Sequence, residues 1–379
     1  MLRILSIGTA LVVCLTWQAS AMAAARGATP FAAQAAFTIP PANVAATSPI
    51  LDGSHIVYGV SQPRFHRPVC VSCGQRPFAA FRVQMYVRDY AEGSSSITIS
   101  RPRLLFEGPQ GAQILAYSLV RGWLVYATVR TGDRWELVAR NISHGNRVPL
   151  DSPSMEGLPS RFLNASTDGR TVVWQAWTKL HGRETSVIRS YSLTTRRRRL
   201  LLAGGHGQDY FYVPAQIAGT RLILEKDSSG PSTQILLENL VTRHLRALTP
   251  PGQMNFEAFV SGDTLAWVHG QPTTDHVHGI VVANLATGRR VALKRSSAKL
   301  ARIVEGRYVV FVTDYQRPSV QVYDTQTGRR WTVASGNAPG FSPSSWVETG
   351  GNSMLFAMTK PCGSPGRCPA HLVLASLTP

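Results

Sequence analysis

The chain has few acidic residues and few cysteines, and it lacks any long apolar run. Its 21 Asp and Glu residues face 39 Lys and Arg residues, which gives a formal net charge of +18, and only five of the basic residues are lysines. With 44% hydrophobic and 16% charged residues the composition is globular, which excludes a coiled coil and a disordered chain. The longest apolar stretch, Ile4 to Trp17, is shorter than the roughly 20 residues that a membrane span needs.

Residues 1–25 have the pattern of a secretory signal peptide. Arg3 precedes the apolar stretch, and small residues after it offer A-x-A cleavage sites at Ala19/Ala21 or Ala21/Ala23. This pattern predicts a cleaved signal and an extracytoplasmic location, which is periplasmic, wall-associated or secreted, with no transmembrane span after signal removal. An uncleaved anchor helix is the alternative.

Four cysteines follow the predicted signal, in two closely spaced pairs. Because an exported chain meets an oxidising environment, we expect disulfides, and zinc binding by all four thiolates is the alternative. The cysteines are Cys70, Cys73, Cys362 and Cys368.

A short sequence motif recurs along the chain, in which a Gly-containing turn precedes a run of β-branched or aromatic residues. One copy is Asp168-Gly169 followed by Val172-Val173-Trp174, and after a longer first step the copies lie about 45 residues apart. Each copy is followed by an alternating strand, a second turn and a short outer strand, and no helical periodicity appears after residue 25. A period near 45 that contains only strands is typical of propeller blades. The sequence therefore predicts an all-β protein, a seven-bladed β-propeller of four-stranded antiparallel blades.

The last blade is one strand short at the C-terminus. An open edge would leave backbone groups unpaired, so we expect Phe31 to Ile39 to supply the outer strand and close the ring. A frayed N-terminal leader is the alternative. The predicted organisation is a signal peptide at 1–25, a leader and closing strand at 26–42, and a single propeller at 43–379.

The repeat resembles that of the TolB-like propellers. The resemblance rests on Ser166 to Trp174, with its Asp168-Gly169 turn, and on Ser190 to Thr195 and Arg199 to Leu202, which follow it. It covers about residues 43 to 377 and implies a closed ring with a binding habit, but no catalytic residue. Two departures are the absence of proline before Asp168 and the lack of room for the N-terminal α/β domain that TolB carries.

In a propeller, the loops between strands b and c and the crossings between blades share one face, where binding is common. The titratable and aromatic side chains in the long loops of that face are our candidate binding residues. They are His181, His206, Asp209, His269, Asp275, His276, Asp314 and Tyr315. A solvated strand end explains the histidines equally simply, and we predict no metal site, no cofactor and no catalytic residue. Motifs for nucleophilic, P-loop and zinc-protease chemistry are missing.

Arginines collect in the predicted hairpins between strands c and d, on the opposite face. Such a ring is suited to an anionic envelope polymer or to lipid headgroups. Charged outer strands that prevent edge pairing are the alternative reason. Nucleic acid is not expected as a partner. The arginines proposed for this contact are Arg196, Arg197, Arg198, Arg199, Arg243, Arg289, Arg290, Arg329 and Arg330.

These features together favour an exported, non-catalytic propeller that acts as a rigid binding platform for a protein or glycan partner. The alternative is a propeller enzyme, a hydrolase or lyase acting on a polysaccharide or small ester at the channel mouth. His269, Asp275 or His206 would serve that enzyme.

Overall fold

The fold consists of strands and turns. The computed structural model describes residues 29–31, 33–39, 49–63, 81–93, 96–130, 134–152, 164–206, 210–228, 232–270, 277–294, 301–313, 319–335, 342–359 and 370–377. Within these ranges no helix is long and apolar enough to cross a membrane.

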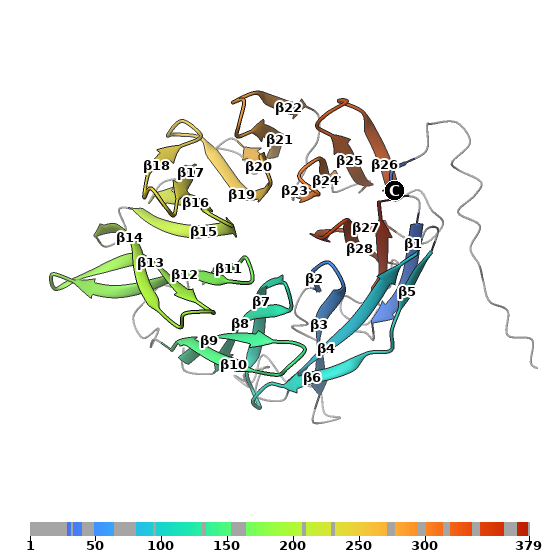
Figure 1. Cartoon of the computed structure of the whole chain (residues 1–379), viewed down its shortest axis with the longest axis horizontal. Helices are drawn as coiled ribbons and strands as arrows, with labels where there is room; N and C mark the ends of the chain where they lie inside the picture. Colours follow the sequence, from blue (N-terminus) through green and yellow to red (C-terminus); the bar gives the residue numbers. More distant parts are fainter. Residues whose placement is uncertain are drawn as a thin grey trace, which may run out of the picture.

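The described strands form seven consecutive four-stranded units, which we call blades 1 to 7. They lie in six sheets, because blades 4 and 5 share an eight-stranded sheet through one parallel bridge between Thr233 and Met254. In each blade the strands run a to d from the central channel to the rim. Figure 1 shows the blades arranged as a ring, with β2, β7, β11, β15, β19, β23 and β27 nearest its axis. The predicted all-β propeller of four-stranded antiparallel blades is confirmed.

The first four blades follow the chain order. Blade 1 contains β2 (Ile50–Leu51), β3 (His55–Pro63), β4 (Phe81–Glu92) and β6 (Arg103–Glu107), and β5 (Ile97–Ile99) pairs with the end of β4. Blade 2 contains β7 (Gln113–Val120), β8 (Trp123–Arg130), β9 (Arg134–Asn141) and β10 (Arg147–Asp151). Blade 3 contains β11 (Ala165–Thr167), β12 (Thr171–Leu180), β13 (Arg183–Ser192) and β14 (Arg198–His206). Blade 4 contains β15 (Tyr210–Ala218), β16 (Arg221–Ser228), β17 (Thr233–Asn239) and β18 (Leu245–Ala247).

The remaining blades complete the ring. Blade 5 contains β19 (Met254–Ser261), β20 (Thr264–Gly270), β21 (Val277–Asn284) and β22 (Arg290–Lys294). Blade 6 contains β23 (Ala301–Val304), β24 (Tyr308–Thr313), β25 (Ser319–Asp324) and β26 (Arg330–Ser335). Blade 7 contains β27 (Ser342–Gly350), β28 (Ser353–Thr359), β29 (Ala370–Ser376) and, from the other end of the chain, β1 (Ala33–Ile39).

Strand β1 closes the ring, as the missing strand of the last repeat predicted. It pairs antiparallel with β29, from Ala33 opposite Ser376 to Ile39 opposite Ala370. Just before it, the fully buried side chain of Phe31 packs among residues of blades 6 and 7 and meets the Tyr308 ring edge-on at 5.9 Å. Closure thus depends on both backbone pairing and an aromatic anchor.

Polar side chains fix the hairpins between strands c and d. In blade 4 the Asn239 amide oxygen accepts hydrogen bonds from the N–H groups of Val241 and Thr242, at 2.9 and 3.1 Å. Asn141 and Asn284 make the same pair of bonds in blades 2 and 5. Asn and Asp favour such turns because their short side chains reach the backbone two or three residues on.

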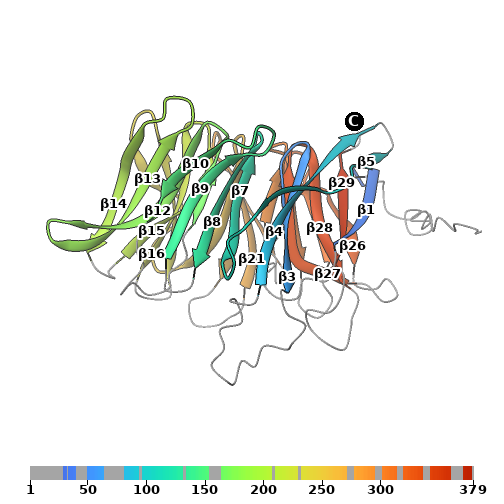
Figure 2. The ribbon, with the colours of Figure 1, turned by 90° about the horizontal axis from the view of Figure 1, so that it is seen from below.

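The a–b turns and the c–d turns lie on one face of the ring. The N–H after strand c donates to a carbonyl of the a–b turn in several blades, for example from Leu193 to Arg170 and from Leu240 to Thr220, both at 2.8 Å. Figure 2 shows the blades side-on, with their strands roughly parallel to the ring axis. The two sets of turns therefore share one face in these blades.

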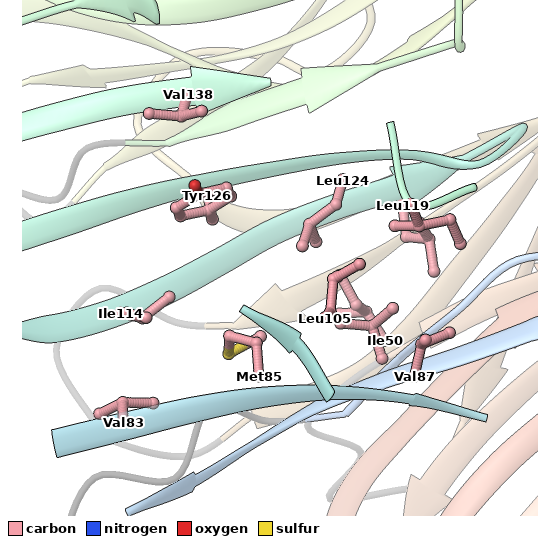
Figure 3. Close-up of a cluster of buried hydrophobic side chains, with 12 residues drawn as sticks. Ile50, Val83, Met85, Val87, Leu105, Ile114, Leu119, Leu124, Tyr126 and Val138 are labelled. Carbon is pink, nitrogen blue, oxygen red and sulfur yellow. The ribbon is translucent and has the colours of Figure 1, made fainter. Parts of the chain in front are cut away.

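The core lies between neighbouring blades. Figure 3 shows Ile50, Met85 and Leu105 of blade 1 facing Ile114 and Leu124 of blade 2, and all of these side chains are buried. Alternate residues of each strand point to opposite faces of its sheet, so each blade contributes to two such clusters. The packed sheets hold the inner strands in fixed positions around the channel.

Candidate active site in the central channel

The inner strands of all seven blades line one cavity. It has a volume of about 1150 Å³ and extends along the channel to the a–b turns. This volume is slightly above the range of typical small-molecule sites. Its lining includes charged side chains on the strands of blades 4 to 7, namely Glu225, Glu257, Arg302 and Glu348, and five more at or beside the a–b turns, namely Asp52, Arg121, Asp168, Arg221 and Glu305.

Glu225 and Glu257 form the junction between blades 4 and 5. The Ala258 N–H donates to Oε1 of Glu225 at 3.2 Å. The pairing of β19 with β20 shifts register between Phe256 and Phe259, and Glu257 has a φ of 54°, in the left-handed region. This β-bulge directs backbone N–H groups toward a carboxylate of the neighbouring blade. Strain of this kind costs about 1 to 3 kcal/mol and persists where the surrounding structure enforces it.

The environment of Glu225 moves its pKa to about 7. Burial is the largest cause, since it penalises the charged carboxylate, and the nearby charges of Glu257 and Asp227 act in the same direction. Hydrogen bonds from the N–H groups of Ala258 and Glu257 oppose the shift. A carboxyl group that titrates near neutral pH is suited to give and take a proton in a reaction.

Arg302 and Glu348 form an ion pair on the adjoining part of the wall. Nη2 of Arg302 lies 3.0 Å from Oε1 of Glu348, and Nε lies 3.3 Å from Oε2, which makes the contact bidentate. The guanidinium also stands 5.1 Å from the centre of the Phe259 ring, two residues along the chain from Glu257. The acidic pair, the ion pair and an aromatic ring therefore share one side of the cavity.

The structure places two predicted histidines away from this cavity. Nδ1 of His269 lies 2.9 Å from the Asn255 amide oxygen, which also accepts a hydrogen bond from the Trp267 indole at 3.0 Å. His181 is exposed in the turn between β12 and β13, with a φ of 51°. Neither histidine is among the described residues that line the cavity.

The other predicted residues of the long-loop face are not brought together by the described part. The backbone of His206 pairs with Thr185 in blade 3. The remaining candidates lie outside the described residues, as do all four cysteines of the predicted disulfides or zinc site. These are Asp209, Asp275, His276, Asp314, Tyr315, Cys70, Cys73, Cys362 and Cys368. Within the described ranges no cluster of three or more His, Cys, Asp or Glu residues is arranged to hold a metal ion.

Several of the predicted surface arginines connect neighbouring blades. Arg198 and Arg290 donate hydrogen bonds to the carbonyls of Leu150 and Leu248 in the preceding blade, and Arg243 does the same to Leu201. Arg330 stands over the Phe311 ring and Arg329 over the Trp331 ring. By contrast, four exposed arginines make no side-chain hydrogen bond, ion pair or ring contact with another described residue, namely Arg196, Arg197, Arg199 and Arg289.

Sequence reasoning missed the charged residues of the channel. Glu225 directly follows the apolar run Leu222 to Leu224, and Glu257 interrupts a run that otherwise reads Phe256 to Val260 as strand. An acidic residue next to or within an otherwise apolar strand segment is the signal that was present. The sequence did not show that both residues line the same cavity, because this depends on how the two strands pack in the ring.

The comparisons with known proteins identify propellers. No protein family model and no curated protein matches the chain. The chain is similar to TolB from Acinetobacter baumannii, with 20% identity and a TM-score of 0.45, covering 66% of this chain and 59% of TolB. It is similar to a prolyl endopeptidase, with 13% identity and a TM-score of 0.58, covering 83% of this chain and 45% of the enzyme. It is also similar to the β-propeller domain of the Trilobed protease from Pyrococcus furiosus, with 7% identity and a TM-score of 0.56, covering 87% of this chain and 92% of that domain.

The expectation of a non-catalytic platform is corrected by these comparisons. The similar structures include propeller enzymes, among them prolyl endopeptidases, and this favours the alternative of a propeller enzyme. The chain spans about half the length of the first two proteins it matches, and at these identities the likeness itself concerns the fold. The resemblance predicted from the repeat is confirmed at that level, and the chain has a β-propeller fold.

Proposed function

We propose that the chain is an exported enzyme, a hydrolase or lyase, that cleaves a short sugar chain inside the central channel. The proposal rests on Glu225. Its carboxyl group lies in the cavity wall beside Glu257 and has a pKa of about 7. Glu225 would act as the general acid or base. Export rests on the signal-peptide pattern of residues 1–25.

The arrangement suits a sugar substrate for three reasons. Cleavage of a glycosidic bond commonly uses two carboxyl groups of unlike protonation, and Glu257 supplies a second one next to Glu225. The ion pair of Arg302 and Glu348 offers charged hydrogen-bonding groups for hydroxyl or carboxylate substituents. Phe259 adds an apolar surface on the same side. A closed ring restricts the substrate to short fragments or chain ends.

The test is an activity screen of the purified chain against oligosaccharides of differing charge, with small esters as a second substrate class. For the oligosaccharides, release of reducing ends detects both hydrolysis and lyase cleavage, and a new carbon–carbon double bond in the product distinguishes a lyase from a hydrolase. For the esters, release of acid detects hydrolysis. Glu225→Gln is expected to lower kcat by a factor of about 10² to 10⁴, the usual contribution of a general acid or base. If Glu225 acts as the acid, kcat/KM of the unmodified enzyme should fall as the pH rises above about 7.

A matched control is Glu184→Gln, which changes an exposed glutamate on β13 of blade 3. This variant is expected to keep full activity. Unchanged kcat and an unchanged pH profile in Glu225→Gln would show that the carboxyl group takes no part in catalysis. A chain with no activity on either class of substrate would contradict the proposal as a whole.

A further inference from the structure

A ledge on the outer rim of blades 3 and 4 carries an excess of positive charge. It contains Arg196 and Arg197 in the turn before β14 and Arg199 on β14. All three side chains are exposed, and none has an ion-pair or hydrogen-bond partner among the described residues. Both β14 and β18 are edge strands, and Figure 1 shows them next to each other on the rim.

Acidic residues do not neutralise this ledge. Glu238 of blade 4 is buried and forms an ion pair with Arg243, at 3.0 Å between Oε1 and Nε. Asp168, in the a–b turn of blade 3, accepts hydrogen bonds from the backbone N–H groups of Arg170 and Thr171. The side chain of Arg170 is itself exposed and offsets the charge of Asp168.

Two apolar side chains are exposed on these blades, Val241 in the c–d turn of blade 4 and Leu200 on β14, where it points to the sheet face opposite to that of Arg199. Val241 is 74% exposed and Leu200 is 53% exposed, and they are two of the three large apolar residues exposed in the described part of the chain. The Val241 N–H is held by Asn239, so its turn is preordered. A hydrogen bond from Arg243 to the Leu201 carbonyl ties that turn to β14, which brings Val241 close to the strand that carries Arg199.

We propose that this ledge docks the protein on a bilayer that contains anionic phospholipid. Arginines near such a surface are attracted to its negative potential, and each contributes about 1 kcal/mol. Apolar side chains that enter the boundary between headgroups and acyl chains add a second, salt-independent contribution. The exposed Val241 favours a bilayer over a soluble anionic polymer, because a polymer offers it no apolar surface to enter. The ledge lies outside the channel, so the proposal is independent of the enzymatic one.

The experiment measures sedimentation of the purified full chain with vesicles of phosphatidylglycerol and phosphatidylcholine in equal parts, and with vesicles of phosphatidylcholine alone. The chain is expected to bind the anionic vesicles, and binding should weaken as the salt concentration rises. Arg197→Ser together with Arg199→Ser should weaken the binding about 30-fold, the factor that corresponds to about 1 kcal/mol for each arginine. Val241→Ser should weaken it about fivefold and leave its salt dependence unchanged. Residues 1–28 are common to all variants, so the differences report on the ledge.

The matched control is Lys179→Ser together with Arg183→Ser. It removes the same charge from exposed positions on β12 and β13 of blade 3, beside the turn that contains His181. This control should bind like the unmodified chain, and Glu225→Gln should too. Equal losses in the control and the ledge variant would show that only net charge matters, and would overturn the proposal. Equal binding to phosphatidylcholine alone, or a soluble anionic polysaccharide that binds through Arg197 and Arg199 but not Val241, would also overturn it.

Discussion

Single residues in this ring occupy equivalent positions in successive blades, so a blade with an unusual residue type at such a position can be recognised. In the c–d turns, the fourth residue after the turn-forming Asn, Asp or Ser has a positive φ, and it is glycine at Gly145, Gly288 and Gly328. Blades 3 and 4 place Arg196 and Arg243 there, with φ values of 56° and 59°. Side chains with a Cβ atom are strained in this conformation.

Arg196→Gly is therefore expected to stabilise the protein by about 0.5 to 1 kcal/mol. Relief of left-handed strain is worth about 1 to 2 kcal/mol, and the greater freedom of glycine in the unfolded chain cancels part of it. The free energy of unfolding from denaturant titration checks the prediction. Arg197→Gly, one residue along, is the control and should not stabilise, since no positive φ is found at Arg197. A loss of stability in Arg196→Gly would mean that the arginine side chain stabilises the turn.

At the scale of elements, strand β1 shows what a local sequence pattern can predict and what requires knowledge of the whole fold. Residues 33–39 alone predict only a short strand, and a leader without structure was an equally simple interpretation. The seven-fold repeat, which ended one strand early, supplied the missing partner. Phe31, by contrast, was not recognisable as a core residue, because its burial depends on blades 6 and 7 meeting across the closure.

Deletion of residues 1–39 should destabilise the ring strongly, while deletion of residues 1–28 should leave the thermal midpoint unchanged. The longer deletion removes the partner of β29 and leaves an open edge, which also promotes aggregation. It removes Phe31 as well, and loss of a buried phenylalanine alone typically costs about 3 to 5 kcal/mol. Scanning calorimetry and light scattering of the two truncated chains check this. Equal midpoints for both would show that the ring does not need β1.

At the scale of the whole molecule, contacts between blades link the stability of the ring to pH. Asp52 is buried in the a–b turn of blade 1, where Oδ1 lies 2.9 Å from Nδ1 of His55 and Oδ2 accepts a hydrogen bond from Gly122 of blade 2 at 2.9 Å. The hydrogen bond to Asp52 raises the pKa of His55, against the effect of burial, and Asp89 adds to the rise. Burial works to raise the pKa of Asp52, but the hydrogen bonds from His55 and Gly122 outweigh it and lower the value.

These pKa shifts determine how the stability of the ring changes with pH. Because the pKa of His55 is raised above 6.5, its contribution to stability is fully present below pH 6.5 and is lost as the pH rises through the raised pKa. The contribution of Asp52 is present above its ordinary pKa of 3.8 and is lost as the pH falls through the lowered value. The pair therefore stabilises the ring most between about pH 4 and 6.5.

The thermal midpoint of the unmodified chain should fall between pH 6 and 8.5 by more than that of His55→Gln. Asp52→Asn should cost about 1 to 3 kcal/mol at pH 6, because it exchanges an acceptor of several N–H groups for an amide that also donates. Denaturation curves across this pH range check both variants. Parallel curves for the unmodified chain and His55→Gln would contradict the assigned coupling.

The sequence by itself determined the repeat, the four strands of each blade, their turns and the closing strand, because these depend on short-range alternation and on turn residues that act locally. Only the tertiary structure decided which charged residues share the channel wall, since Glu225, Glu257, Arg302 and Glu348 come from four blades that meet only when the ring closes. It also separated the arginines that hold neighbouring blades together from those that face solvent. That difference depends on the distance to a carbonyl in another blade, which no local pattern encodes.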